Sequence, residues 1–233
     1  LLNQQGIRHC IGFFSDSKLG RLGSTDVTLQ VIPFFHILGF MIQLFCFACS
    51  AKVVVLTKFK PDVYLKNIED HKVTKLYSVP SLVVFLAKSP LVSKYDISSV
   101  NRIVVGGAPL SVGVIEEVEE KLKSVKICQV YGMTELGGMM AMQTIVGNNK
   151  VGSVGTVPPG VSSKVCNPDS GLALKPLEMG ELCFKSSAMM KGYISNTGLI
   201  RNCFDDDGFY HTGDLGYYDH DNNFFIVDRI KEL

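Results

Sequence analysis

The sequence predicts an α/β protein, with a largely parallel sheet covered by helices and a small antiparallel β-barrel after it. Three observations carry this prediction. Apolar, β-rich runs alternate with helical patterns over residues 26–130. Glycine and proline cluster after about residue 150, and short β-like runs follow them. Apolar residues make up 46% of the 233 residues and charged residues 19%, as in folded domains. We expect the α/β part over residues 1–148 and the barrel over residues 149–228.

The elements of the α/β part follow one another in a regular order. Strands are expected where β-branched and apolar residues dominate, at residues 27–33, 53–56, 73–79, 102–105 and 126–130. Helices are expected between them, at residues 37–51, 61–71, 80–88 and 112–123. Pro61 and Pro80 fit the first turn of a helix, and Ser111 fits an N-cap. This alternation favours parallel strands, whose ligands bind beyond the carboxyl ends.

The sequence pattern changes after residue 150. Its short β-like runs lie at residues 163–166, 181–185, 209–211 and 224–227. Asp221-Asn222-Asn223 is a turn signal between two of these runs. Asp205-Asp206-Asp207 precedes a glycine and predicts a solvated turn rather than a metal site.

Composition excludes several classes of protein. The formal net charge is +1 without a basic stripe, which argues against a generic nucleic-acid or acidic-membrane surface. The apolar run 37–51 is shorter than the roughly 20 residues of a membrane span, so a buried core helix is expected there and no transmembrane segment. Seven cysteines and no secretory signal indicate a reducing intracellular compartment, peroxisomal or cytoplasmic. Cys46 and Cys49 are expected to be a buried structural pair, not a metal or redox site.

Two loops at strand ends carry candidate chemistry. In the first, Val105–Leu110, two glycines permit close approach of a flat group to the backbone, although an ordinary tight turn explains this loop alone. In the second, Gln129–Gly138, Thr134 can donate to a phosphoryl oxygen and Glu135 can hold Mg²⁺. A helix N-terminus, with Thr134 as its cap, is the alternative. The two loops follow consecutive strands, so we expect them to face a shared crevice.

Five segments, in order, resemble motifs of the adenylate-forming superfamily, which includes acyl-CoA synthetases, 4-coumarate–CoA ligases, beetle luciferases and peptide-synthetase adenylation domains. The segments are Pro33-Phe34-Phe35-His36, Gly106-Gly107-Ala108-Pro109-Leu110-Ser111, Tyr131-Gly132-Met133-Thr134-Glu135, Tyr210-His211-Thr212-Gly213-Asp214 and Ile226-Val227-Asp228-Arg229-Ile230-Lys231. Together they cover nearly the whole chain, and five motifs in order are far more specific than any one of them.

The resemblance implies a role for each matched residue. Phosphate and Mg²⁺ are expected at Thr134 and Glu135, the acyl carboxylate at His36, and the acyl group at Leu38, Gly132 and Met133. The adenine is expected beside Gly107, Ala108, Pro109, Gln129 and Tyr131. The ribose is expected at Asp214 and Arg229, the adenylate at Lys231, and CoA at Lys58. Of these, His36, Thr134 and Glu135 are the expected catalytic residues. The alternative, purely structural interpretations are a core histidine for His36, a turn cap for Asp214 and a surface ion pair for Arg229.

The match also departs from the family's pattern. The Ser/Thr/Gly-rich phosphate loop and the C-terminal domain with its catalytic lysine are not found, so the resemblance implies an internal fragment, inactive alone, with residues 229–233 starting the hinge. Val130 stands where the family often has glycine. Leu38 and Gly138 stand where luciferases carry an aromatic and a hydroxyl side chain, which favours a ligase.

The expected activity is therefore activation of a carboxylic acid by ATP and Mg²⁺ to an acyl-AMP, followed by transfer to CoA. A luciferase-type monooxygenase of the same superfamily is one alternative. A non-catalytic nucleotide-binding or scaffold protein is another. A Rossmann-type dehydrogenase is disfavoured, because the glycine fingerprint is missing. Small molecules are the expected partners, and the sequence does not specify an acyl substrate or an oligomeric state.

Overall fold

The structure, a computed structural model, describes residues 4, 7–8, 11–12, 22–144, 149–196 and 198–230. The chain divides into two compact units. We call Phe14–Gln129 the parallel-sheet unit, and we call the other, which includes Val130–Leu233, the antiparallel-sheet unit. Each is described by itself.

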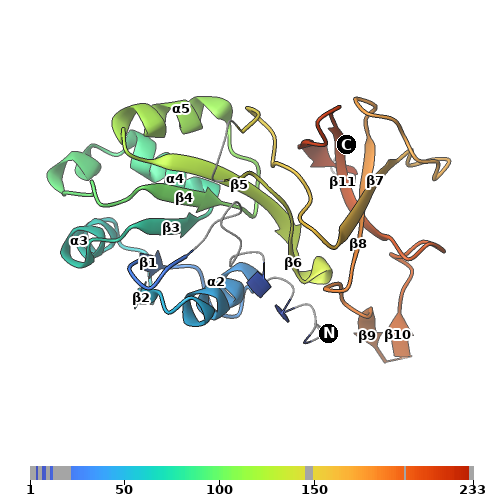
Figure 1. The fold of residues 1–233 in the computed structure, drawn as a ribbon, viewed down its shortest axis with the longest axis horizontal. Helices are drawn as coiled ribbons and strands as arrows, with labels where there is room; N and C mark the ends of the chain where they lie inside the picture. Colours follow the sequence, from blue (N-terminus) through green and yellow to red (C-terminus); the bar gives the residue numbers. More distant parts are fainter. Residues whose placement is uncertain are drawn as a thin grey trace. The chain divides into compact units, whose positions relative to one another are not determined.

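The parallel-sheet unit is built on five parallel strands (Figure 1). They are β1 (Val27–Gln30), β2 (Lys52–Val55), β3 (Lys75–Ser78), β4 (Arg102–Val105) and β5 (Lys126–Met133). Their order in the sheet is β2-β1-β3-β4-β5, and every neighbouring pair is parallel. The predicted α/β class with a largely parallel sheet is confirmed.

Four α-helices connect these strands, and each lies within a segment that the sequence predicts to be helical. They are α2 (Ile37–Ala48), α3 (Pro61–His71), α4 (Pro80–Lys88) and α5 (Val112–Lys121), with a 3-10 turn η1 (Pro90–Lys94) after α4. Pro61 and Pro80 occupy the first turns of α3 and α4, where a missing N–H costs nothing. Ser111 precedes α5 as predicted, but its side chain makes no capping hydrogen bond.

Different helices cover the two faces of the sheet. Alternate residues of a strand point to opposite faces, so neighbouring residues of β1 contact different helices. Leu29 belongs to the main core, which it shares with buried residues of α3, α4 and α5. Its neighbours on β1 face α2 instead. Thr28 Oγ1 lies 3.5 Å from Cys46 Sγ, and Gln30 Nε2 donates to the Gly39 carbonyl at 2.9 Å. Helices therefore cover both faces, and Figure 1 shows α4 and α5 side by side.

Helix α2 differs from its prediction in two ways. It ends at Ala48 rather than residue 51, and Phe40 and Phe47 on its outer side are exposed, so only one face is buried. Cys46 is buried but Cys49 is only half-buried, and both are free thiols. The expectation of a buried pair is therefore correct for Cys46 alone. Among the described residues, no helix has the length and apolarity needed to cross a membrane.

Strand β5 runs past its predicted end at Val130 to Met133. The 3-10 turn η2 (Thr134–Leu136) then leads into β6 (Gly138–Met142), which pairs antiparallel with the second half of β5. This close pairing requires glycine at position 132. A Cβ atom there would lie 1.9 Å from the carbonyl oxygen of Gly138.

The antiparallel-sheet unit contains a four-stranded sheet and a short hairpin. The sheet strands are β7 (Val161–Cys166), β8 (Gly180–Ser186), β11 (Tyr210–Tyr218) and β12 (Phe224–Arg229), in the order β12-β11-β8-β7. The hairpin consists of β9 (Tyr193–Ser195) and β10 (Gly198–Ile200). The predicted antiparallel structure is present. A closed barrel is not confirmed, because the outer strands β12 and β7 do not pair with each other in the described part of the chain.

Candidate nucleotide-binding site

Asp214 is the most enclosed of the predicted site residues in the antiparallel-sheet unit. It is 5% exposed, and each of its carboxylate oxygens has a side-chain partner. The Tyr131 hydroxyl donates a hydrogen bond to Oδ2 at 2.6 Å, and Arg229 Nε forms an ion pair with Oδ1 at 2.8 Å. Burial and the neighbouring Asp214 carboxylate raise the pKa of Tyr131 well above its usual value, so the phenol keeps its proton. Three predicted site residues are thus brought together.

A bulge in β11 presents this carboxylate. The pairing of β11 with β8 shifts register between His211 and Leu215, so the intervening residues leave the regular ladder. Thr212 Oγ1 donates to the Leu182 carbonyl at 2.7 Å and accepts from the Asp214 N–H at 3.0 Å. The hydroxyl therefore fixes the backbone immediately before the carboxylate.

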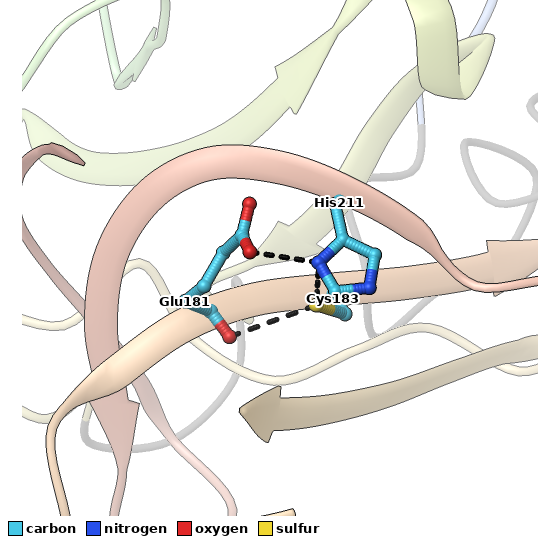
Figure 2. A group of neighbouring side chains, drawn as sticks. All are labelled: Glu181, Cys183 and His211. Atoms are coloured by element: carbon cyan, nitrogen blue, oxygen red, sulfur yellow. Dashed lines mark hydrogen bonds and ion pairs between the residues drawn. The ribbon is translucent and has the colours of Figure 1, made fainter. Parts of the chain in front are cut away.

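Glu181 on β8 holds the same bulge from its other end. Its Oε1 accepts the Gly213 N–H at 2.8 Å, and its Oε2 lies 2.7 Å from Nδ1 of His211. Figure 2 shows the carboxylate and the imidazole facing each other across the two strands. Gly213 has φ +71, a left-handed conformation that glycine adopts without the penalty of a side chain. Glu181 is therefore a positioning residue for the segment that carries Asp214.

Thr134 and Glu135 lie on the short η2 turn, not at the start of an α-helix. Thr134 is exposed. Glu135 Oε1 accepts a hydrogen bond from the Tyr193 hydroxyl at 2.9 Å, and that hydroxyl lies 3.3 Å from the hydroxyl of Tyr210. The Glu135 carbonyl accepts the Met190 N–H at 2.8 Å, so the backbone of the turn is also held. The turn thus presents a hydroxyl and a carboxylate together.

The predicted adenine-side residues lie at two neighbouring strand ends of the parallel-sheet unit. Val105, the last residue of β4, pairs with Gln129 of β5. The loop after β4 contains Gly107 at φ +90, a conformation that favours glycine, and both Ala108 and Pro109 are exposed. The loop therefore starts beside Gln129, which is 5% exposed.

The remaining predicted residues are more dispersed. His36 is exposed, and its Nδ1 caps helix α2 by accepting the Leu38 N–H at 3.2 Å, so it is not a core histidine. Leu38 and Met133 are half-buried, and Lys58 is exposed after β2. Lys231 lies outside the described residues.

Comparison with known proteins identifies the family of the chain. A family model described as "AMP-binding enzyme" matches residues 3–194. The chain belongs to the AMP-binding enzyme family. Curated relatives of this AMP-binding chain include luciferin 4-monooxygenase of Nipponoluciola cruciata, 41% identical over 205 residues, which are 88% of the chain and 37% of that protein. Another is 4-coumarate–CoA ligase CCL1 of Humulus lupulus, 38% identical over 89% of the chain and 39% of that protein.

Solved structures resemble the whole AMP-binding chain. The ATP-bound MatB of Rhodopseudomonas palustris superposes with a TM-score of 0.90 at 28% identity, over 100% of this chain and 45% of MatB. MenE of Bacillus subtilis, in complex with ATP and magnesium ion, gives 0.83 at 26% identity, over 100% of this chain and 47% of MenE. The chain thus spans less than half the length of these relatives.

Three residues of the candidate site have no role predicted from the sequence. Tyr193 contacts Glu135 from 58 positions away, and Glu181 contacts Gly213 from 32 positions away. Tyr210 lies in the segment Tyr210-His211-Thr212-Gly213-Asp214, but the resemblance assigns no role to it. Only the pairing of distant strands brings these side chains to the site.

Proposed function

We propose that the protein activates a carboxylic acid with ATP and then transfers the acyl group to CoA. The observation that carries this proposal is the buried Asp214 carboxylate, held between Tyr131 and Arg229 in a chain of the AMP-binding enzyme family. Support also comes from relatives named as 4-coumarate–CoA ligases and from the ATP-bound MatB and MenE structures.

The ribose hydroxyls are the proposed ligands of Asp214. A carboxylate has about four acceptor positions, so one hydrogen bond and one ion pair leave capacity for two hydroxyl donors. The Arg229 side chain is 56% exposed and is free to turn toward the same ribose. The adenine is proposed to lie against Gly107, Ala108 and Pro109, where the bare backbone of the glycine permits close approach.

The residues of the η2 turn are proposed to act on the phosphates. The exposed Thr134 hydroxyl donates to a phosphate oxygen. Glu135 fits a hard cation, since the Tyr193 hydroxyl holds one carboxylate oxygen and, within the described residues, Oε2 accepts no hydrogen bond. Bound there, Mg²⁺ supplies neutralisation of phosphate charge.

The proposed reaction has two displacements. An oxygen of the acid attacks the α-phosphorus of ATP, the bond to the β-phosphate oxygen breaks, and pyrophosphate leaves. The CoA sulfur, having lost its proton, then attacks the acyl carbonyl carbon, and AMP leaves with the bonding electrons. A carboxylate is a weak nucleophile, so alignment and charge stabilisation by the protein must lower the first barrier. His36 is proposed to lie beside the acid, and Lys58 beside CoA.

A luciferase-type monooxygenase is the second candidate, because the relatives include luciferin 4-monooxygenases at up to 41% identity. Leu38 and Gly138, where the resemblance implies an aromatic and a hydroxyl side chain in luciferases, favour the ligase. The test is to incubate the full-length protein with ATP, Mg²⁺ and CoA across fatty and aryl acids, and separately with ATP, Mg²⁺, luciferin and oxygen. The proposal expects acyl-CoA thioesters and no light. Light without thioester would favour the monooxygenase, and neither product would favour a non-catalytic nucleotide-binding protein.

A further inference from the structure

One face of the antiparallel sheet carries four potential soft-metal ligands on three adjacent strands. Glu181 and Cys183 are two positions apart on β8, so they point to the same side. His211 of β11 lies opposite Cys183, and Cys166 of β7 lies opposite Glu181. Figure 2 shows the first three side chains converging. The pairing of strands, not sequence proximity, creates this cluster.

The ligand atoms of the cluster lie close enough together to share one metal ion. The ligand atoms of Glu181, Cys183 and His211 all lie within 4.8 Å of one another. The Cys183 Sγ to His211 Nδ1 separation is 3.5 Å. In a tetrahedral zinc site, with Zn–N about 2.0 Å and Zn–S about 2.3 Å, that edge is about 3.5 Å. The Glu181 Oε2 to Nδ1 separation of 2.7 Å would have to open to about 3.3 Å.

We propose that Glu181, Cys183 and His211 bind a borderline-soft divalent cation such as Zn²⁺. Cys166 lies opposite Glu181 on β7 and is 1% exposed, but its thiol does not belong to the group of ligand atoms that lie within 4.8 Å of one another. Thiolate and imidazole ligands select zinc-like ions over Mg²⁺ and Ca²⁺, which prefer oxygen. The site is separate from Glu135, the proposed Mg²⁺ ligand.

A catalytic Cys–His–Glu arrangement does not account for this cluster. A relay needs the thiol on one imidazole nitrogen and the carboxylate on the other, whereas Cys183 and Glu181 both contact Nδ1 of His211. Cys183 is 0% exposed, so its sulfur is not accessible to a substrate in the way that a nucleophile requires. Shared contact at one nitrogen is what a metal at that nitrogen would produce.

Neighbouring side chains orient His211 and leave it partly exposed to solvent. The other imidazole nitrogen, Nε2, faces Asp205 Oδ2 at 3.6 Å, the carboxylate–histidine arrangement that orients metal-bound imidazoles. Asp205 is itself fixed by Lys164 Nζ at 2.6 Å and the Phe209 N–H at 2.8 Å. The Lys164 charge is thus paired. The His211 side chain is 30% exposed, which leaves a path for the ion from solvent.

The test uses Co²⁺ as a spectroscopic probe on the reduced, metal-free protein. We expect one equivalent to bind with thiolate-to-cobalt charge-transfer absorption and tetrahedral d–d bands, and we expect Zn²⁺ to displace it. Cys183→Ser and His211→Gln should each weaken binding by at least about 10-fold. The matched control is Cys46→Ser/Cys49→Ser, which removes the other close pair of thiols and should leave the spectrum and affinity unchanged.

Two results would overturn the proposal. One is the absence of charge-transfer absorption at millimolar Co²⁺, and the other is loss of the signal in the Cys46/Cys49 control but not in Cys183→Ser. Circular dichroism checks that each variant folds. If Cys183→Ser fails to fold because its thiol is buried, the half-exposed His211→Gln decides alone: unchanged Co²⁺ affinity in that variant would exclude the site.

Discussion

The hydrogen bond from Tyr131 to Asp214 offers a direct test of the geometry around the predicted ribose site. Tyr131→Phe removes one hydroxyl and leaves the ring. The acceptor is a carboxylate with 8% side-chain exposure, and the bond is 2.6 Å long. Hydrogen bonds to charged groups contribute about 1.5–3 kcal/mol. We therefore expect Tyr131→Phe to lower the free energy of unfolding by about that amount.

The other contact of Asp214 should contribute less. The Arg229 side chain is 56% exposed, so water screens its charge, and exposed pairs are worth about 0–1 kcal/mol. Arg229→Gln should thus cost less than Tyr131→Phe. In a double-mutant cycle of Tyr131→Phe with Asp214→Asn, we expect a coupling energy of at least about 1 kcal/mol, because the two groups touch.

Urea unfolding followed by far-UV circular dichroism measures these differences, since the chain has no tryptophan. The chain forms two compact units, so a second probe must show a coincident transition before a single free energy is assigned. A coupling energy near zero, or a larger cost for Arg229→Gln than for Tyr131→Phe, would refute the reasoning.

Two further changes probe the fold. Burial alone would raise the pKa of Asp219, but hydrogen bonds from Lys150 and from backbone amides lower it from 3.8 to about 2. A lowered folded-state pKa stabilises above pH 3.8, and this effect disappears as the pH falls through about 2. Asp219→Asn should therefore lower the free energy of unfolding by about 1–2 kcal/mol at pH 6, measured by urea unfolding, and by almost nothing near pH 2. An equal decrease at both pH values would contradict this. Gly132→Ala should lower the free energy of unfolding by more than about 2 kcal/mol, because its Cβ would meet the Gly138 carbonyl. The control Gly113→Ala lies in α5 with open space around it and should raise the free energy of unfolding by up to about 1 kcal/mol. Equal thermal midpoints for the two variants would contradict this.

Local patterns predict the parallel-sheet unit well, because each element carries its own signal. Pro61 and Pro80 mark helix starts, and apolar runs such as Arg102–Val105 mark buried strands. Local patterns predict the antiparallel strands less well. The sequence predicts a short strand at residues 209–211, whereas β11 extends to Tyr218, because pairing with both β8 and β12 stabilises polar and glycine positions that have low strand propensity.

The candidate site is predictable only in part for the same reason. Asp214 lies in a motif, so its position is readable from the sequence. Its partner Tyr131 is 83 positions away, and no local pattern indicates their hydrogen bond. Position 132 requires glycine because β6 approaches its backbone closely, and the sequence does not reveal this approach. The roles assigned to the site residues, those of His36, Lys58 and Lys231 included, remain predictions.

Acid-dependent ATP–pyrophosphate exchange tests the central claim most directly. The wild-type full-length protein should exchange label only with ATP, Mg²⁺ and a suitable acid, and each variant is made in the same full-length protein. Glu135→Ala should lose about 100- to 1,000-fold, the usual effect of one electrostatic contact in a transition state. Glu120→Gln, an exposed glutamate on α5, should exchange like the wild type. Exchange by Glu135→Ala at the wild-type rate, or no exchange by the wild type with any fatty or aryl acid, would contradict the account.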